Sequence, residues 1–293
     1  MACPFLKEGR ARYCHAVPVQ KLILDGPGAS DGGRCASPEY RKCEWVARDK
    51  SQDEARGEER VDEQHDRCPH LEEIRVQYCG VSPVTKLVPF SDSELSSCTS
   101  NSYRYCDSYL SLARPHATAP LDHLLYTPNH FWLDAEASGL CHVGIDGFFA
   151  DVAGNVDAVT FATLHGTHRP ALALKINGVE WPMSFPNPLM IQRVNSRVRS
   201  DPARLTADPY GAGWLFEGWE VPGRTRAGLV SGQQGAAWQA EERERLTREI
   251  HDTHAPGCDG GSPVRGVAQF LSRQHLVCLF QHFFSGRGWT VEE

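Results

Sequence analysis

Residues 3–14 read CPFLKEGRARYC, and residues 68–79 read CPHLEEIRVQYC. When both segments are extended by eight residues, they are identical at eleven of twenty positions. The match resumes further along the chain, where CASPEYRKC at residues 35–43 corresponds to CTSNSYRYC at residues 98–106. The chain therefore contains an internal duplication, and each copy keeps four cysteines.

The repeated cysteines predict two metal sites. A unit of about forty residues rarely folds without a disulfide, a metal or a partner, and a bound metal can supply the missing free energy of folding. The spacing is C-x10-C-x20-C-x7-C in the first copy and C-x10-C-x18-C-x7-C in the second. Neither copy has the C-x2-C element of common zinc sites or bacterial ferredoxins. We expect one four-cysteine site per repeat, with the ligands Cys3, Cys14, Cys35 and Cys43 in the first and Cys68, Cys79, Cys98 and Cys106 in the second.

Four thiolates suit either iron–sulfur clusters or zinc. Two 4Fe–4S-type clusters are the first expectation, because widely scattered ligands suit a large cluster and a pair of similar sites suits electron relay. Zinc is the alternative cofactor, and an arrangement of thiols or disulfides is a third reading. An assembly in which cysteines of both repeats share one site also stays open.

Composition narrows the class of protein. The 293 residues are 41% hydrophobic and 23% charged, as in ordinary globular proteins, and the net charge of −7 gives no reason to expect nucleic acid as a partner. No apolar run reaches the roughly eighteen residues of a membrane span, and the N-terminus has no secretory pattern. These features predict a cytoplasmic protein, in which patterned cysteines are metal ligands rather than disulfides.

The composition of the chain differs outside the two repeats. Residues 47–67 are almost wholly polar and read as a linker between the repeats. Beyond the connector at residues 113–120, short β-like runs alternate with turn residues. Asn177-Gly178 between apolar runs predicts a tight hairpin. The candidate strands, which together predict a compact sandwich or barrel, are residues 142–145, 158–164, 172–176, 189–194 and 214–219.

Three motifs in this β-rich region resemble the glycine cleavage H-protein family. They read YTPNHFWL from Tyr126, VGID from Val143 and DPYGAGWLF from Asp208. The resemblance covers about residues 124–219 and implies a lipoyl-type β-sandwich. It also implies where the family's lipoyl lysine would lie: counting back from Phe185-Pro186 places that position at Gly178.

The resemblance therefore implies an H-like domain that does not carry lipoate. A slipped alignment would instead make Lys175 the attachment site. The segment at residues 177–188 holds Trp181, Met183 and Phe185, which either form an exposed docking surface for a partner or close the sandwich.

The C-terminal region predicts two helices, at residues 236–254 and 267–284. Trp238, Leu246 and Ile250 would anchor the first helix. The apolar side chains of the second would pack on the body of the protein or on a partner; they are Phe270, Leu271, Leu276, Leu279 and Phe280. His275 and His282 share a face of the second helix and are candidate metal ligands, although such a pair is more often a surface feature. Cys278 reads as a buried apolar residue, and Cys258 lacks a repeat counterpart.

Three common catalytic motifs are missing from the sequence. The chain contains no Walker A, H-E-x-x-H or G-x-G-x-x-G pattern. Cys141 and His142 are adjacent, which places their side chains on opposite faces of a strand and argues against a dyad.

The predicted fold class is α+β: duplicated four-cysteine metal-binding repeats, a lipoyl- or H-protein-like β-sandwich, and a helical C-terminal tail. The predicted function is that of a cytoplasmic iron–sulfur protein without its own catalytic site, acting as an electron-transfer or accessory subunit docked to a redox enzyme or larger complex. The alternatives are a zinc-stabilised scaffold and a lipoyl carrier that uses Lys175. The predicted segments are residues 1–46 (first repeat), 47–67 (linker), 68–112 (second repeat), 113–222 (H-like domain) and 223–293 (C-terminal extension).

Overall fold

The structure is a computed structural model, and the chain folds into two compact units, Met1–Ser100 and Asn101–Glu293. The predicted linker at residues 47–67, the connector at 113–120 and Cys258 lie largely or wholly outside the described residues. The described residues are 2–16, 21–23, 32–47, 66–82, 86–88, 97–113, 121–252 and 264–285.

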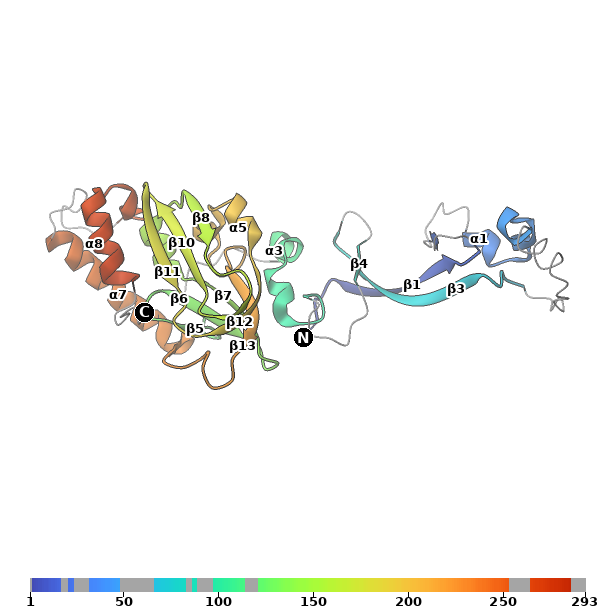
Figure 1. The fold of residues 1–293 in the computed structure, drawn as a ribbon, viewed down its shortest axis with the longest axis horizontal. Helices are drawn as coiled ribbons and strands as arrows, with labels where there is room; N and C mark the ends of the chain where they lie inside the picture. The colour runs from blue at the N-terminus through green and yellow to red at the C-terminus, as the bar shows by residue number, and fades with distance from the viewer. Residues whose placement is uncertain are drawn as a thin grey trace. The chain divides into compact units, whose positions relative to one another are not determined.

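The first unit is built on a long antiparallel ribbon (Figure 1). Its two strands are β1 (Leu6–Cys14) and β3 (Leu71–Cys79), which are the same stretch of the two repeats. The short strands β2 (Lys21–Ile23) and β4 (Leu87–Val88) pair with the outer edges, so the sheet order is β2-β1-β3-β4. The two copies of the repeat therefore share one sheet rather than folding separately.

The register of this ribbon gives the two copies a local two-fold relationship. Arg10 faces Arg75, its own counterpart in the other repeat. Consequently the pair Leu6↔Cys79 at one end of the ribbon mirrors the pair Cys14↔Leu71 at the other end. Strands β1 and β3 are thus arranged like the equivalent strands of a symmetric dimer, although both belong to one chain.

Short helical turns lie at or near the last two cysteines of each copy. In the first copy these are α1 (Gly32–Cys35) and η1 (Pro38–Lys42), which belong to the first unit. In the second copy, η2 (Asn101–Tyr105) and α3 (Asp107–Ala113) belong to the second unit.

The second unit contains two antiparallel sheets, as predicted for an H-like β-sandwich (Figure 1). The smaller sheet has the order β11-β10-β8, with β8 at Ala158–Phe161, β10 at Ala171–Ile176 and β11 at Val179–Ser184. The larger sheet has the order β14-β5-β6-β7-β13-β12-β9. Its strands are β5 (Leu125–Tyr126), β6 (Phe131–Ala135), β7 (Leu140–Ile145), β9 (Gly166–His168), β12 (Leu189–Val194), β13 (Phe216–Glu220) and β14 (Val230–Ser231).

The inner faces of both sheets form one apolar core. Trp181, Met183 and Phe185 belong to this core, with at most 3% of their surface exposed. They alternate with outward-facing residues along and beyond β11, as the pleat of a half-buried strand requires. The idea that these three residues form an exposed docking surface is therefore wrong, and they close the sandwich instead.

Three short helices lie among the strands of the second unit. Helix α4 (Gly147–Ala153) follows β7, and α5 (Ser196–Ser200) and α6 (Arg204–Ala207) follow β12.

The C-terminal extension packs on the sandwich (Figure 1). Helix α7 (Gly232–Asp252) buries Leu246 and Ile250 as predicted. The second predicted helix is divided: η3 (Val267–Gln269) is followed by α8 (Arg273–Phe283), because Ser272 caps the N-terminus of α8 by accepting a hydrogen bond from His275 N. Phe270 lies in the break and is 64% exposed, so it does not pack on the body of the protein.

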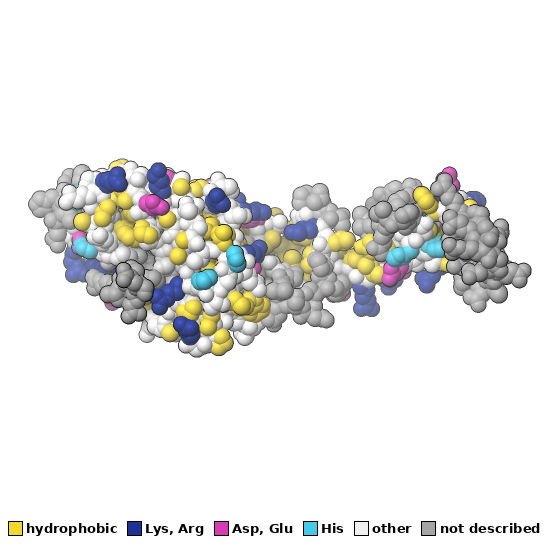
Figure 2. Space-filling view, in the orientation of Figure 1, with side chains coloured by type: hydrophobic (Ala, Val, Ile, Leu, Met, Phe, Trp, Pro, Cys, Tyr) yellow, Lys and Arg dark blue, Asp and Glu magenta, His cyan; other side chains and the backbone are white. Residues whose placement is uncertain are grey.

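Two surface properties bear on the class of protein. None of the described helices combines the length and apolar composition that a bilayer span requires. On the face drawn in Figure 2, the Lys and Arg side chains of the second unit are scattered rather than gathered into one basic patch.

Candidate functional site

The first candidate site is a buried polar cluster formed by the H-like motifs. His130 follows β5, and its Nδ1 lies 3.0 Å from Asp146 Oδ2. Asp146 is the N-cap of α4, where its other oxygen accepts a hydrogen bond from Phe149 N at 3.0 Å. Gln239 of α7 donates to Asp146 at 2.9 Å. Three segments far apart in the chain are therefore joined through one carboxylate.

The carboxylates of this cluster raise the pKa of His130. Burial lowers the pKa of His130, but the charge and hydrogen bond of Asp146, together with Glu242, outweigh burial and raise that pKa above its ordinary value. The ring is stacked between Phe148 and Trp238, with centroid separations of 4.3 and 4.8 Å. Because the side chain has no exposed surface, it is a structural group rather than one that could meet a substrate.

The remaining motif residues also serve packing. Trp132 Nε1 donates to the carbonyl oxygens of Ile145 and Pro209, each at 3.0 Å. Gly144 lies against the indole, where a Cβ would come within 2.5 Å of a ring carbon. Tyr210 OH accepts a hydrogen bond from Gly147 N at 2.9 Å. The three motifs thus identify the sandwich and carry no exposed reactive group of their own.

The hairpin β10–β11 corresponds to the family's lipoyl-bearing hairpin. Its tip is Asn177-Gly178, with φ of 47° and 74°, as the hairpin signal predicts. Lys175 lies in β10 opposite Glu180, exposed and two residues before the tip. The residue at the tip is therefore not a lysine.

The tip is also tied to the C-terminal extension. Asn177 Nδ2 donates to the carbonyl oxygens of Ala268 and Gln269 at 3.4 and 3.3 Å. Gly178 N donates to Asp157 at 3.1 Å. The side chain of Gln269 in turn donates to Ala153 O at 2.7 Å. No sequence signal pointed to this tether, because it joins residues about ninety positions apart.

Cys141 and His142 do not form a dyad. Cys141 Sγ donates to Gly218 O at 3.3 Å, and burial raises the pKa of this thiol well above its ordinary value. His142 instead pairs with Glu217 at 2.7 Å, and Arg193 reaches the same carboxylate at 2.6 Å. Burial opposes ionisation of Glu217, but the hydrogen bonds and charges of His142 and Arg193 lower its pKa from 4.5 to about 2.

The predicted histidine pair on α8 is not assembled as a metal site. His282 Nδ1 lies 2.7 Å from Glu249 on α7, so this side chain joins the two helices. His275 lines a different small hollow together with Cys278, which is half-buried rather than fully buried as predicted.

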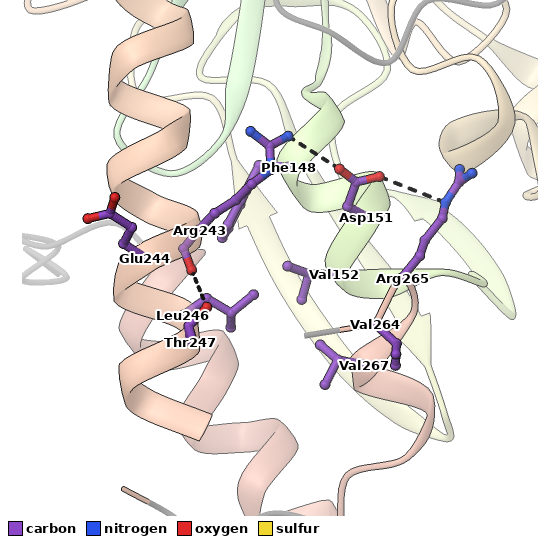
Figure 3. A pocket seen from close by; sticks show the side chains of 10 residues that line it. All are labelled: Phe148, Asp151, Val152, Arg243, Glu244, Leu246, Thr247, Val264, Arg265 and Val267. Atoms are coloured by element: carbon purple, nitrogen blue, oxygen red, sulfur yellow. Dashed lines mark hydrogen bonds and ion pairs between the residues drawn. The ribbon is translucent and has the colours of Figure 1, made fainter. Parts of the chain in front are cut away.

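A pocket of about 390 Å³ lies between α4, α7 and the segment before η3 (Figure 3). Asp151 stands between Arg243 and Arg265, which approach it to 3.3 and 3.8 Å. Apolar side chains, including Phe148 and Leu246, form the rest of the lining. The pocket is amphipathic, and its arginines are already paired with a carboxylate.

The cysteines of the first unit gather near the ends of the ribbon. At one end, Cys68 is buried in a cluster with Cys35 and Cys43, packed around Tyr40 and Leu71. Burial raises the pKa of the Cys68 thiol, and the nearby Cys14 and Cys43 raise it further. The backbone of Cys68 donates to Cys35 O at 2.8 Å.

The other end repeats the backbone contacts of this arrangement. Cys3 N donates to Cys98 O, also at 2.8 Å, and Cys79 is paired with Leu6 in the ribbon. Cys106 lies in the second unit, just after η2. Among the described residues, no group of three or more His, Cys, Asp or Glu side chains is arranged to hold a metal ion as the side chains stand.

Residues 124–221 match the family model described as Glycine cleavage H-protein. Over 98 residues the chain is 32% identical to glycine cleavage system H protein 1 of Pseudomonas syringae pv. tomato, covering 33% of this chain and 77% of that protein. The chain belongs to the glycine cleavage H-protein family.

Other relatives agree. The glycine cleavage system H protein of Nocardia farcinica is 35% identical over 107 residues, which cover 34% of this chain and 78% of that protein. A crystal structure of a glycine cleavage system H protein from Mycobacterium marinum covers 42% of this chain and 98% of its own, at 24% identity and a TM-score of 0.36. The family match lies within the second unit, and the cysteine repeats lie outside it. The resemblance read from the three motifs is thereby confirmed.

Proposed function

We propose that this protein is an accessory subunit that uses an H-like domain without lipoate to dock on a protein partner. We also propose that bound metal stabilises its cysteine ribbon, by which we mean the β1–β3 ribbon with the cysteines near its ends. The observation that carries the proposal is the hairpin tip. In place of a lysine it has Asn177-Gly178, and Asn177 is hydrogen-bonded to Ala268 and Gln269. A carrier needs a free, exposed tip that can visit an active site, and this tip is tied to its own chain.

Lys175 is a poor substitute for the missing lysine. It lies within β10, where its backbone carbonyl accepts a hydrogen bond from Asp157 N at 2.7 Å and its cross-strand neighbour is Glu180. A lysine in that position presents its amine from a flat strand rather than from a turn. The carrier alternative is therefore less well supported than docking.

Measurement of the intact mass tests whether this protein can be lipoylated. The protein is produced with a competent lipoyl ligase and lipoate, beside a lipoylated H protein as positive control. We expect no lipoyl adduct on this protein. An adduct that is lost in Lys175→Arg would overturn the proposal in favour of the carrier.

The cysteine ribbon supports a structural role for the metal. Strand β1 spans nine residues, so its ends are about 27 Å apart at about 3.4 Å per residue. Electron tunnelling weakens exponentially with distance, so sites at the two ends would exchange electrons poorly with each other. A metal at the end that holds Cys68 would instead fasten α1 and η1 to a ribbon that has little core of its own.

Iron–sulfur clusters in an electron-transfer subunit of a redox enzyme are the second candidate. The observation that favours them is the wide spacing of the cysteines in each repeat, C-x10-C-x20-C-x7-C in the first copy, because scattered ligands suit a large cluster. Metal analysis with an absorption spectrum of protein purified without oxygen separates the two candidates. Absorption near about 400 nm together with bound iron indicates clusters, and a colourless protein with zinc indicates structural sites. Background amounts of both metals would overturn metal binding altogether.

A further inference from the structure

The structure pairs the strands of the two repeats, and this pairing changes which cysteines are neighbours. Because β1 and β3 are antiparallel with Arg10 opposite Arg75, the start of one copy lies beside the end of the same stretch in the other copy. Cys68, at the start of the second copy, is therefore carried to the end of β1, where Cys14 is paired with Leu71.

Packing at this end of the ribbon gathers the same residues. Cys68 is 4% exposed and shares one apolar cluster with Cys35 and Cys43. Its backbone N donates to Cys35 O, and Leu71, which is paired with Cys14 in the ribbon, packs against the same cluster. Three cysteines of the first repeat thus lie near the end of the ribbon that holds Cys68.

The opposite end shows the mirrored contacts. The hydrogen bond from Cys68 to Cys35 has its counterpart in the bond from Cys3 to Cys98, and both measure 2.8 Å. Likewise Leu71 N donates to Cys68 O at 3.1 Å, and Leu6 N donates to Cys3 O at 3.0 Å. Each repeat therefore places its first cysteine beside the third cysteine of the other repeat.

We propose that Cys14, Cys35, Cys43 and Cys68 form one metal site, so that each site of this protein takes its first cysteine from the other repeat. Cys3 accordingly belongs with Cys79 and Cys98. The proposed ligands are soft thiolates, which select zinc or iron–sulfur clusters over harder ions. Residues of one repeat alone do not complete the site, and binding the metal clips residues 14–43 to residue 68.

The inference rests on the proposed metal binding, and one experiment separates the two. Metal per full-length chain is measured for the wild type and for two matched double variants, Cys14→Ala with Cys68→Ala and Cys14→Ala with Cys3→Ala. The first pair removes two ligands of one site, so about half of the wild-type metal should remain. The second pair removes one ligand from each site, so the metal should fall to background.

The reverse pattern would show that each repeat builds its own site and would overturn the inference while leaving metal binding intact. A wild type without metal would overturn the proposed function itself.

A second measurement covers the case in which both variants lose all metal through unfolding. Metal-depleted wild-type chain is treated with dibromobimane, a short reagent that bridges two neighbouring thiols, and is then digested with trypsin. We expect the peptide beginning at Cys68 to be linked to peptides that contain Cys14, Cys35 or Cys43. Links from Cys68 to peptides of Cys79 or Cys98 would contradict the exchange, and so would a link pattern equal to that of urea-denatured protein.

Discussion

His130 Nδ1 and Asp146 Oδ2 lie 3.0 Å apart, and neither side chain has any exposed surface. The same carboxylate caps α4 and receives a hydrogen bond from Gln239 of α7. The pair therefore links an H-like motif, the helix that follows the second motif, and the C-terminal extension.

Replacing Asp146 should be severely destabilising. Asp146→Asn removes the charged partner of a buried histidine, and breaking a buried pair in this way costs about 3–5 kcal/mol. We expect a loss of this size in the free energy of unfolding measured with urea. Asp201→Asn is the matched control, because its pair with Arg204 is exposed and should contribute at most about 1 kcal/mol. Equal effects of the two variants would contradict the structural role of Asp146.

The sandwich should lose stability in acid through Glu217. The pKa of Glu217 is about 2 in the folded protein, against an ordinary value of 4.5. A depressed carboxyl pKa contributes stability above the unfolded value, and this contribution disappears as the pH falls from about 4.5 to about 2. Glu217→Gln should flatten the pH dependence of the unfolding free energy in this window. The exposed Glu241→Gln should leave the slope unchanged, and an unchanged slope in Glu217→Gln would refute the assignment.

Gly144 should be intolerant of a methyl group. A Cβ at this position would lie 2.5 Å from the Trp132 ring, and overpacking of this kind typically costs about 1–3 kcal/mol. Gly144→Ala should therefore lower the unfolding free energy by that amount. In a Trp132→Phe background the cost should shrink, because the colliding atoms belong to the part of the indole that Phe lacks. A double-mutant cycle checks this, and additive effects would argue against the contact.

The hairpin tether can be broken without changing the turn. Asn177→Asp keeps the size of the side chain and tolerates the positive φ, but it presents an acceptor to the carbonyl oxygens of Ala268 and Gln269. We expect faster amide hydrogen exchange in η3 and at the hairpin tip, with a stability loss of about 0.5–1.5 kcal/mol. Asn187→Asp, which breaks two similar bonds to Thr225 and Ala227, is the control. It should leave exchange at the tip unchanged.

Local sequence patterns were sufficient to predict much of the β-sandwich. The apolar alternation of residues 189–194 coincides with β12, and Asn177-Gly178 forms the predicted turn because only its backbone preferences decide that geometry. The burial of Trp181 was ambiguous, since an apolar strand residue can face either a core or a partner. The second sheet decides this, and it comes from residues distant in the sequence.

The cysteine ribbon was harder to predict. Strands β1 and β3 are rich in charged side chains, such as Lys7 and Arg12, so their hydrophobic pattern is weak. The central pairing is also non-local, because β1 and β3 come from different copies of the repeat. The repeat made the eight cysteines visible as a set, but grouping them required the antiparallel register of Arg10 and Arg75.

That register has an evolutionary consequence. A single repeat that paired with a second copy of itself about Arg10 would form a closed homodimer, and gene fusion would convert it into the present chain. Once joined, the halves were free to diverge. Lys42 is exposed in the first half, whereas its counterpart Tyr105 is buried, donates to Asp134 at 2.6 Å and stacks on His142 at 4.0 Å. Equivalent positions of the two repeats thus have different surroundings, one exposed and the other buried among residues of the second unit.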